Sequence, residues 1–195
     1  MTLKTKRLIL RAAKQSDLMD LHAIFSDRRA MRYWSTPPHD SPERTQENLD
    51  RLIASAEQQL TYFVIEMDGR VIGTAGMHMD DEVGFLLHPD YWRQGIISKA
   101  MNAINPYLFE ITDHAQLTAD ADPRNTASVG LLKSLGFEET HRAKNTFCVN
   151  GEWSDSVYFA LPRQTRPIKE RDRSVPQCRP SGPLPPELVQ EKCSQ

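Results

Sequence analysis

The sequence predicts an α+β fold, in which a mixed, mostly antiparallel and twisted sheet is flanked by helices. Three observations predict this class. Short apolar segments of strand length alternate with longer segments whose apolar residues recur every three or four positions. Two hairpin dipeptides, Asp68-Gly69 and Asn150-Gly151, separate neighbouring strand-like segments, so much of the sheet should be antiparallel. Finally, residues 82–100 pass from a strand through a turn into a helix.

The composition fits one sizeable intracellular domain. A chain of 195 residues can bury one large core but is short for two. Its 24 basic and 26 acidic residues nearly cancel, which argues against a chain-wide surface for nucleic acid or an anionic membrane. The three cysteines are scattered and lack zinc-ligand spacing, which fits a reducing compartment. No apolar run approaches the roughly 20 residues of a membrane span, so we expect a cytoplasmic protein.

The N-terminal part predicts a strand followed by two helices. Residues 7–12 form a short apolar segment, and Ser16-Asp17 is a suitable N-cap for the first helix. Ser41-Pro42-Glu43 opens the second helix, with an N-cap, a proline at the first helical position and an early acid. Apolar residues at helical spacing predict the buried faces: Leu18, Leu21 and Phe25 in the first helix, and Leu49, Leu52, Ile53, Ala56 and Leu60 in the second.

A hairpin, a further strand and a long helix follow. Residues 62–67 and 71–79 should pair around the tight turn at Asp68-Gly69, and residues 82–87 make the next strand. Residues 116–121 form another strand beyond the helix. One face of that helix is lined by apolar residues, namely Ile97, Ala100, Met101, Ile104 and Leu108.

The last part predicts a short helix and a final hairpin. Asn125 is placed to cap the helix, and Gly136 ends it. Two strands, within residues 138–149 and 153–161, flank the second hairpin dipeptide. The folded domain should therefore span residues 1–162. Residues 163–195 hold six of the thirteen prolines and little periodic apolar content, which predicts a disordered proline-rich tail.

The segment EVGFLLHPDYWRQGIISKA, residues 82–100, is the most informative in the chain. Its apolar run breaks at His88-Pro89-Asp90, passes Gly95 and resumes with helical spacing. The start of a helix carries unpaired backbone N–H groups and the positive end of the helix dipole. Such a loop suits an anion such as a pyrophosphate, so the segment predicts a phosphate-bearing cofactor.

Two motifs carry a resemblance to a known family. EVGFLLHPDYWRQGIISKA is similar to the acyl-CoA-binding strand, loop and helix of the GNAT superfamily of N-acetyltransferases, and DPRNTASVGLLKSLGF, residues 122–137, is similar to its second half. The resemblance covers roughly residues 3–162 and is strongest to the RimJ/RimL-like branch. It implies the GNAT acyl-CoA N-acyltransferase fold. It also implies direct transfer of an acetyl group from acetyl-CoA to a primary amine, either a protein N-terminus or a small-molecule amine.

The resemblance further implies where acetyl-CoA binds. A bulge would splay the strand at residues 82–87 from its neighbour, so that the backbone of Phe85, Leu86 and Leu87 pairs with the pantetheine amides as an added strand would. Asn125 would hold the cofactor arm or the substrate, although a helix cap explains it equally well. The loop would donate N–H groups to the pyrophosphate, and its residues are Arg93, Gln94, Gly95, Ile96, Ile97 and Ser98.

Two catalytic residues are expected on the same basis. An acceptor amine with a pKa near 10.4 must lose a proton before it attacks the thioester, and Glu82 is the expected base. A water relay or His78 could serve instead, and Glu82 could simply be a solvated carboxylate at a strand end. Ser128 is expected to protonate the departing thiolate, because Leu132 stands where many relatives carry a tyrosine.

A second hypothesis remains open at this level. Ile97 stands where the family loop usually has a small residue, and a β-branched side chain there could crowd the diphosphate. This departure and the missing tyrosine are the grounds for the alternative hypothesis, a non-catalytic acyl-CoA-binding or partner-binding module. We expect no metal, and either a monomer or a homodimer. The first two helices and the final hairpin should wall the acceptor groove, with four aromatic residues available to line it: Tyr33, Trp34, Phe147 and Trp153.

Overall fold

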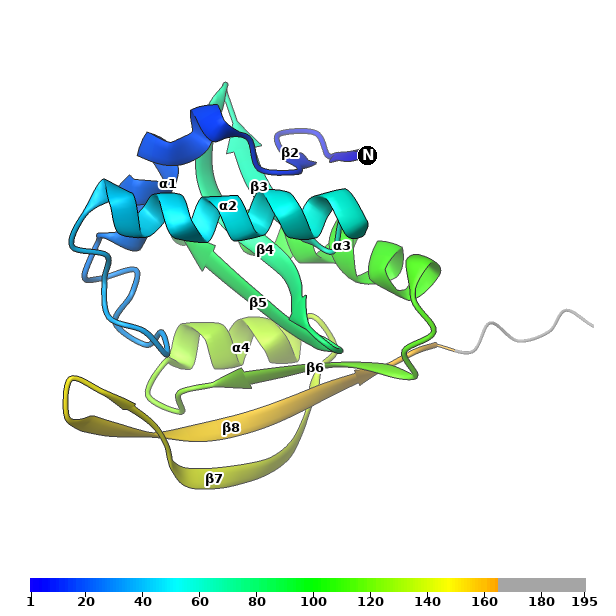
Figure 1. Ribbon diagram of the computed structural model, residues 1–195. Coiled ribbons are helices and arrows are strands. Elements are labelled where there is room, and N and C mark those ends of the chain that lie inside the picture. The colour runs from blue at the N-terminus through cyan, green and yellow to red at the C-terminus, as the bar shows by residue number, and fades with distance from the viewer. Residues whose placement is uncertain (165–195) are drawn as a thin grey trace, which may run out of the picture. The chain divides into compact units, whose positions relative to one another are not determined.

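The computed structural model describes residues 1–164, and the proline-rich tail expected at 163–195 therefore lies almost entirely outside the described residues. The described part is built on one eight-stranded sheet in the order β1-β2-β3-β4-β5-β6-β8-β7 (Figure 1). The strands are β1 Thr2–Lys4, β2 Ile9–Arg11, β3 Tyr62–Met67, β4 Arg70–Met79, β5 Glu82–Leu87, β6 Gln116–Ala121, β7 Glu138–Val149 and β8 Glu152–Pro162.

Four α-helices flank the sheet: α1 Leu18–Phe25, α2 Pro42–Gln58, α3 Ile96–Ile111 and α4 Thr126–Ser134. Every neighbouring pair of strands is antiparallel except β5 and β6, which run parallel. The predicted class, a mixed and mostly antiparallel sheet with flanking helices, is confirmed. Within residues 1–164, no helix combines the length and the apolar content that crossing a membrane requires.

Side chains that alternate along the strands divide the interior into two cores. Val64 and Leu86 pack with the buried residues of α1 and α2. Their neighbours Ile65 and Leu87 belong to the larger core, which includes the buried face of α3 and Leu132 of α4. The helices are therefore distributed over both faces of the sheet, and the central strands are covered on each side.

The predicted turns and caps are formed by the residues that the sequence indicated. Asp68 and Gly69 both have positive φ, 52° and 78°, as the tight β3–β4 hairpin requires. Ser41 caps α2 by accepting a hydrogen bond from the N–H of Arg44, and Asn125 caps α4 by accepting one from the N–H of Ser128. These signals act within a few residues of each other, so they operate without the rest of the fold.

The expected N-cap at Ser16-Asp17 is wrong in its chemistry. Asp17 does precede α1, but its side chain makes no cap hydrogen bond to that helix. It is 5% exposed, and its carboxylate instead accepts from the guanidinium of Arg11, at 2.7 and 3.0 Å, and from the N–H of Lys14 at 2.8 Å. Burial explains why Asp17 pairs with Arg11 and does not cap α1: an unpaired buried carboxylate costs more free energy than a helix end without a side-chain cap.

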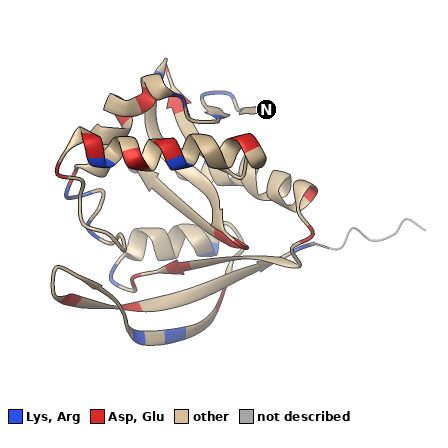
Figure 2. Ribbon diagram, in the orientation of Figure 1, with Lys and Arg blue, Asp and Glu red and all other residues tan. Residues whose placement is uncertain are grey.

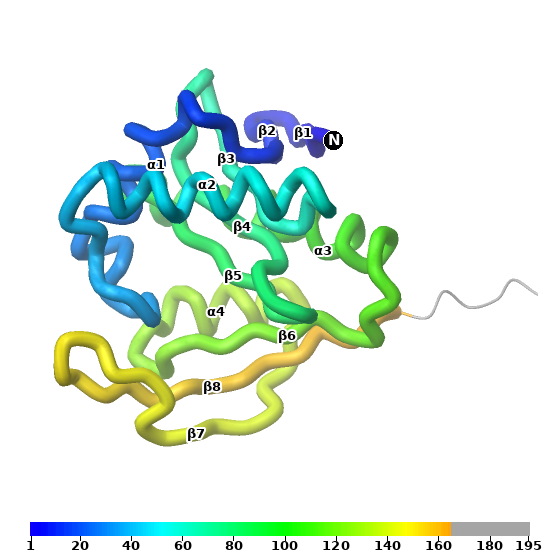
Figure 3. The backbone as a smooth tube through the Cα atoms, viewed as in Figure 1, coloured from blue at the N-terminus to red at the C-terminus, as the bar shows by residue number. Residues whose placement is uncertain are grey.

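The parallel strands β5 and β6 diverge, and this divergence positions the site. Their only registered pair is Glu82 with Thr118, whereas β5 pairs with β4 along its whole length. Thr118 fixes the meeting point, because its N–H donates to the carbonyl of Asp81 at 2.8 Å and its hydroxyl donates to that residue's carboxylate at 2.8 Å. Figure 3 shows the two strands separating from this point. The expected bulge lies in β4, at the register shift between Met77 and Met79, opposite the start of β5.

Candidate active site

The loop between β5 and α3 exposes a row of backbone N–H groups. Arg93 and Gly95 both have left-handed φ values, 60° and 68°, a backbone conformation that is typical of loops whose successive N–H groups form an anion-binding concavity. The N-terminus of α3 adds the positive end of the helix dipole. Among the described residues, none of the following six N–H groups donates to a protein acceptor: those of Arg93, Gln94, Gly95, Ile96, Ile97 and Ser98.

The same loop has open space where an anion would sit. A Cβ built on Gly95 would meet no atom within 4 Å, so the space beside this position, referred to below as the concavity of the loop, is open. Unpaired N–H groups, a helix N-terminus and a missing Cβ together fit a group with the size and charge of a diphosphate. The loop residues expected to bind such a group are thus brought together by the fold.

Ile97 does not crowd this concavity. Ile96 and Ile97 are 1% and 8% exposed, and both side chains belong to the core beneath α3. The departure from the small residue usual in the family therefore alters the core and leaves the amides accessible. Trp92 anchors the other end of the loop, because its indole N–H donates to the carbonyl of Leu87 at 2.9 Å.

Strand geometry decides which backbone groups of β5 face the open edge toward β6. The N–H of His88 donates to the carbonyl of Ile72 in β4. Along a strand, the backbone N–H and C=O groups of every second residue point toward the same neighbouring strand. Leu86 is therefore directed to β4, and its assignment to the pantetheine is wrong. The carbonyl of Asp81 points the opposite way, to β6. Beyond the pair of Glu82 with Thr118, the open edge is accordingly supplied by the alternate residues Phe85 and Leu87.

A cluster of acidic groups lies where β5 and β6 part. Figure 2 shows acidic residues gathered at the β4–β5 turn. Nε2 of His78 lies 3.5 Å from Oε1 of Glu82, and their side chains are 40% and 41% exposed. Asp120 of β6 completes the cluster, with a carboxylate oxygen that accepts from the hydroxyl of Ser156 at 3.1 Å. The two residues weighed as alternative bases are thus neighbours, and Asp120 is a third member that the sequence did not indicate.

The cluster perturbs its own ionisation. Partial burial raises the pKa of the Glu82 carboxyl, and the negative charge of Asp120 raises it further, against the opposing effect of His78. Burial likewise raises the pKa of Asp120, while its hydrogen bond from Ser156 and the nearby His78 act against this. A carboxylate with a raised pKa is a stronger base than a solvated one, as proton removal from an ammonium group requires.

Asp120→Asn should shift the pH dependence of the reaction. Removing the negative charge of Asp120 lowers the pKa of Glu82. The rise of kcat/KM with pH on the acidic side of the pH profile, the acidic limb, should therefore move to lower pH. A pH–rate profile of the variant tests this, with Asp113→Asn, an exposed aspartate near the end of α3, as the control that should leave the limb in place. A limb that stays fixed in Asp120→Asn would show that Asp120 does not influence the titrating base.

The first turn of α4 contains the other predicted residues. Asn125 uses its side-chain oxygen as the helix cap, at 3.2 Å from the N–H of Ser128, so the capping explanation is confirmed for that atom. Ser128 is half-buried, and its hydroxyl makes no hydrogen bond within residues 1–164. Among the described residues, no hydrogen bond joins Ser128 to Glu82. Leu132, at the position of the missing tyrosine, is 1% exposed and lies in the core.

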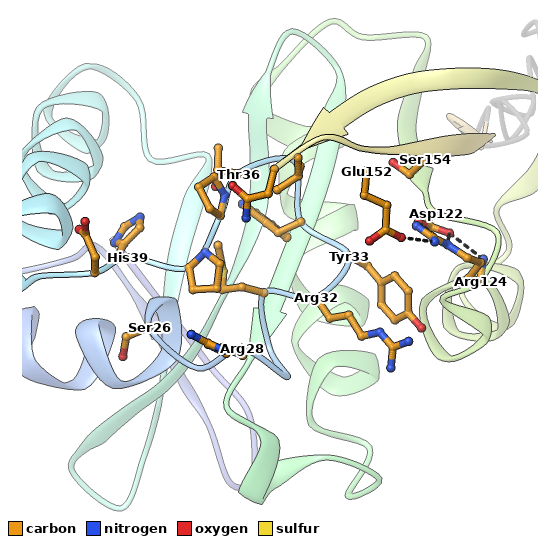
Figure 4. Close-up of a pocket in the computed structure, with 17 residues that line it drawn as sticks. Ser26, Arg28, Arg32, Tyr33, Thr36, His39, Asp122, Arg124, Glu152 and Ser154 are labelled. Atoms are coloured by element: carbon orange, nitrogen blue, oxygen red, sulfur yellow. Dashed lines mark hydrogen bonds and ion pairs between the residues drawn. The ribbon is translucent and has the colours of Figure 1, made fainter.

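A cavity of about 700 Å³ lies between residues 26–40, the turn before α4 and the β7–β8 hairpin (Figure 4). Tyr33 and Trp34 line it as expected, whereas Phe147 and Trp153 do not; those two side chains are 38% and 58% exposed. Trp34 also reaches toward the acidic cluster. A Cβ built on Gly84 would lie 3.8 Å from the ring of Trp34 and 3.6 Å from that of His78.

Charged side chains of both signs line this cavity. Arg124 bridges Asp122 and Glu152, with one distance of 2.6 Å to each, as the dashed lines in Figure 4 show. Arg28 and Arg32 also line the cavity, and within residues 1–164 neither forms an ion pair.

Comparisons with known proteins agree with this geometry. The uncharacterized N-acetyltransferase p20 of Bacillus licheniformis is 28% identical over 169 residues, which cover 82% of this chain and 95% of that protein. The spermidine N(1)-acetyltransferase of Escherichia coli K12 is 23% identical over 158 residues, 78% of this chain and 84% of the relative. The crystal structure of the ribosomal-protein-S5-alanine acetyltransferase from Vibrio fischeri has a TM-score of 0.72 at 24% identity, over 86% of this chain and all of that one.

A family model settles the assignment. Residues 7–138 match the model described as an acetyltransferase (GNAT) domain, which is more than half of the chain. The named relatives are N-acetyltransferases. The chain therefore belongs to the GNAT acetyltransferase family, whose members transfer an acetyl group from acetyl-CoA to an amine.

Proposed function

We propose that this protein is an N-acetyltransferase of the RimJ/RimL-like branch, which moves the acetyl group directly to a primary amine without an acyl-enzyme. The observation that carries the proposal is the row of six unbonded N–H groups beside the open edge of β5, with Glu82 at the point where the strands part. The loop would bind the diphosphate. Alternate residues of β5 would pair with the pantetheine, with Phe85 and Leu87 among them.

Glu82 acts as the base in this scheme. It removes a proton from the acceptor ammonium, which otherwise holds that proton up to a pKa near 10.4. The neutral nitrogen attacks the thioester carbonyl, and an N–H from the open edge of β5 stabilises the oxyanion. The C–S bond then breaks as the amide forms. The second proton of the attacking nitrogen passes through the hydroxyl of Ser128, the donor that the family resemblance indicates, to the departing thiolate.

The acceptor is a primary amine that enters through the 700 Å³ cavity. One similar protein is named for spermidine and one similar fold for the alanine of a ribosomal protein, so both a polyamine and a peptide N-terminus belong in a test. A direct-transfer enzyme needs no protein nucleophile. The described cysteine, Cys148, is exposed on β7 and no role is assigned to it.

A screen of amines tests this function. Acetyl-CoA is incubated with the protein and with spermidine, peptides that begin with Ala or Ser, and small aliphatic amines, while thiol release is recorded. We expect release above the hydrolysis rate with at least one amine, together with an N-acetylated product by mass spectrometry. Tight CoA binding with no release for any amine would instead support a non-catalytic acyl-CoA-binding module.

A further inference from the structure

The turn between β1 and β2 contacts the loop that presents the free amides. Nη2 of Arg7 donates a hydrogen bond to the carbonyl of Gln94 at 2.9 Å, which joins residues 87 positions apart in the sequence. The Arg7 side chain is exposed, and within residues 1–164 it forms no ion pair. Neither the family resemblance nor the local sequence pattern indicates a role for it.

Arg7 is held in place by an ordered turn. The N–H of Thr5 donates to the carbonyl of Leu8 at 2.9 Å, and the N–H of Leu8 donates to the hydroxyl of Thr5 at 3.1 Å. Leu8 is 1% exposed and anchors the turn in the larger core. The backbone that carries Arg7 is therefore fixed, so its guanidinium can act as a support for the neighbouring loop.

The hydrogen bond orients a peptide group of the anion loop. The carbonyl of Gln94 and the N–H of Gly95 belong to one planar trans peptide, so they point in opposite directions. When Arg7 holds the carbonyl on the outer side of the loop, the N–H of Gly95 is turned toward the concavity. That N–H is one of the six without a protein acceptor. The guanidinium also places a positive charge beside a site for a polyanion.

We propose that Arg7 is a positioning residue for acetyl-CoA, which keeps the loop at residues 93–98 in its diphosphate-binding conformation through the carbonyl of Gln94. The inference rests on the proposed diphosphate site. It predicts that Arg7 affects binding of the nucleotide end of the donor and leaves the chemistry at the thioester unchanged. For an acetyl donor that lacks the diphosphate, kcat/KM should therefore not depend on Arg7.

Kinetics with two donors test the proposal. Acetyl-CoA carries the diphosphate, and S-acetylpantetheine lacks it. For Arg7→Met we expect the KM for acetyl-CoA to rise about fivefold to tenfold, as for the loss of one ordinary hydrogen bond, with little change in kcat. With S-acetylpantetheine, kcat/KM should equal that of the wild type. Arg7→Lys keeps the positive charge and a donor, so it should recover part of the loss.

Lys6→Met is the matched control. Lys6 is the exposed neighbour of Arg7, carries the same charge and makes no hydrogen bond within the described residues, so its removal should leave both donors unaffected. An Arg7→Met variant that keeps the wild-type preference for acetyl-CoA would overturn the role of Arg7 alone. A wild type with equal KM for the two donors would overturn the diphosphate site itself. Equal losses with both donors would show that Arg7 only supports the fold.

Discussion

Gly95→Trp should abolish measurable acetyl-CoA binding while the protein remains folded. A Cβ at Gly95 points into space where no atom lies within 4 Å, so the indole would occupy the concavity formed by the loop amides. Several hydrogen bonds to a charged diphosphate would be lost, each worth about 1.5–3 kcal/mol, and the Kd should rise at least ~100-fold. Isothermal titration calorimetry measures the affinity, and circular dichroism verifies the fold.

A second glycine separates this effect from backbone strain. Gly69, in the β3–β4 turn, has a φ of 78°, close to the 68° of Gly95, and a Cβ there would also meet no atom within 4 Å. Gly69→Trp therefore imposes a similar left-handed strain of about 1–2 kcal/mol without filling the loop. It should bind acetyl-CoA like the wild type. Unchanged affinity in Gly95→Trp would refute the assignment of the loop.

Glu82→Gln should reduce kcat/KM by about 10²–10³-fold near neutral pH, the range expected for loss of a general base. In the wild type, activity should rise with pH as Glu82 loses its proton, at a pKa above its ordinary value because of burial and Asp120. The variant should lack this acidic limb. Its deficit should shrink toward pH 10, where the acceptor amine becomes neutral without assistance. A pH–rate profile over the accessible range measures both effects.

Asp80→Asn is the matched control for charge. Asp80 lies in the same β4–β5 turn, is exposed and has a positive φ of 38°, which asparagine tolerates. The substitution removes one negative charge near the cluster but keeps Glu82. Its pH–rate profile should retain the acidic limb. A Glu82→Gln enzyme with wild-type pH dependence would remove Glu82 from the mechanism and favour a water relay or His78.

The parts of the fold that depend on neighbouring residues could be predicted from the sequence. The strand at residues 82–87 coincides with β5 and the strand at 116–121 with β6. The positive φ values of Asp68 and Asn150 are those that their hairpin dipeptides require. In each case the information lies in the periodicity or turn chemistry of a short segment, which operates before any long-range contact forms.

Residues that depend on distant contacts could not be predicted. Asp120 joins Glu82 because β6 runs parallel to β5 after a helical crossover, and Arg7 reaches Gln94 across 87 residues. Leu86 was assigned incorrectly because the direction of its backbone groups depends on the register with β4. The strand β1 has three residues, too few to show a period. Sequence patterns therefore located the loop but not all of its supporting partners.

A crystal structure of the complex with acetyl-CoA would show directly whether the loop at residues 93–98 binds the diphosphate. We expect diphosphate oxygens within about 3.2 Å of several backbone nitrogens among residues 93–98, with the pantetheine along the edge of β5 that faces β6. The acetyl group should lie near Glu82. A diphosphate bound elsewhere, with those N–H groups donating to acceptors of the protein itself, would rule out this site.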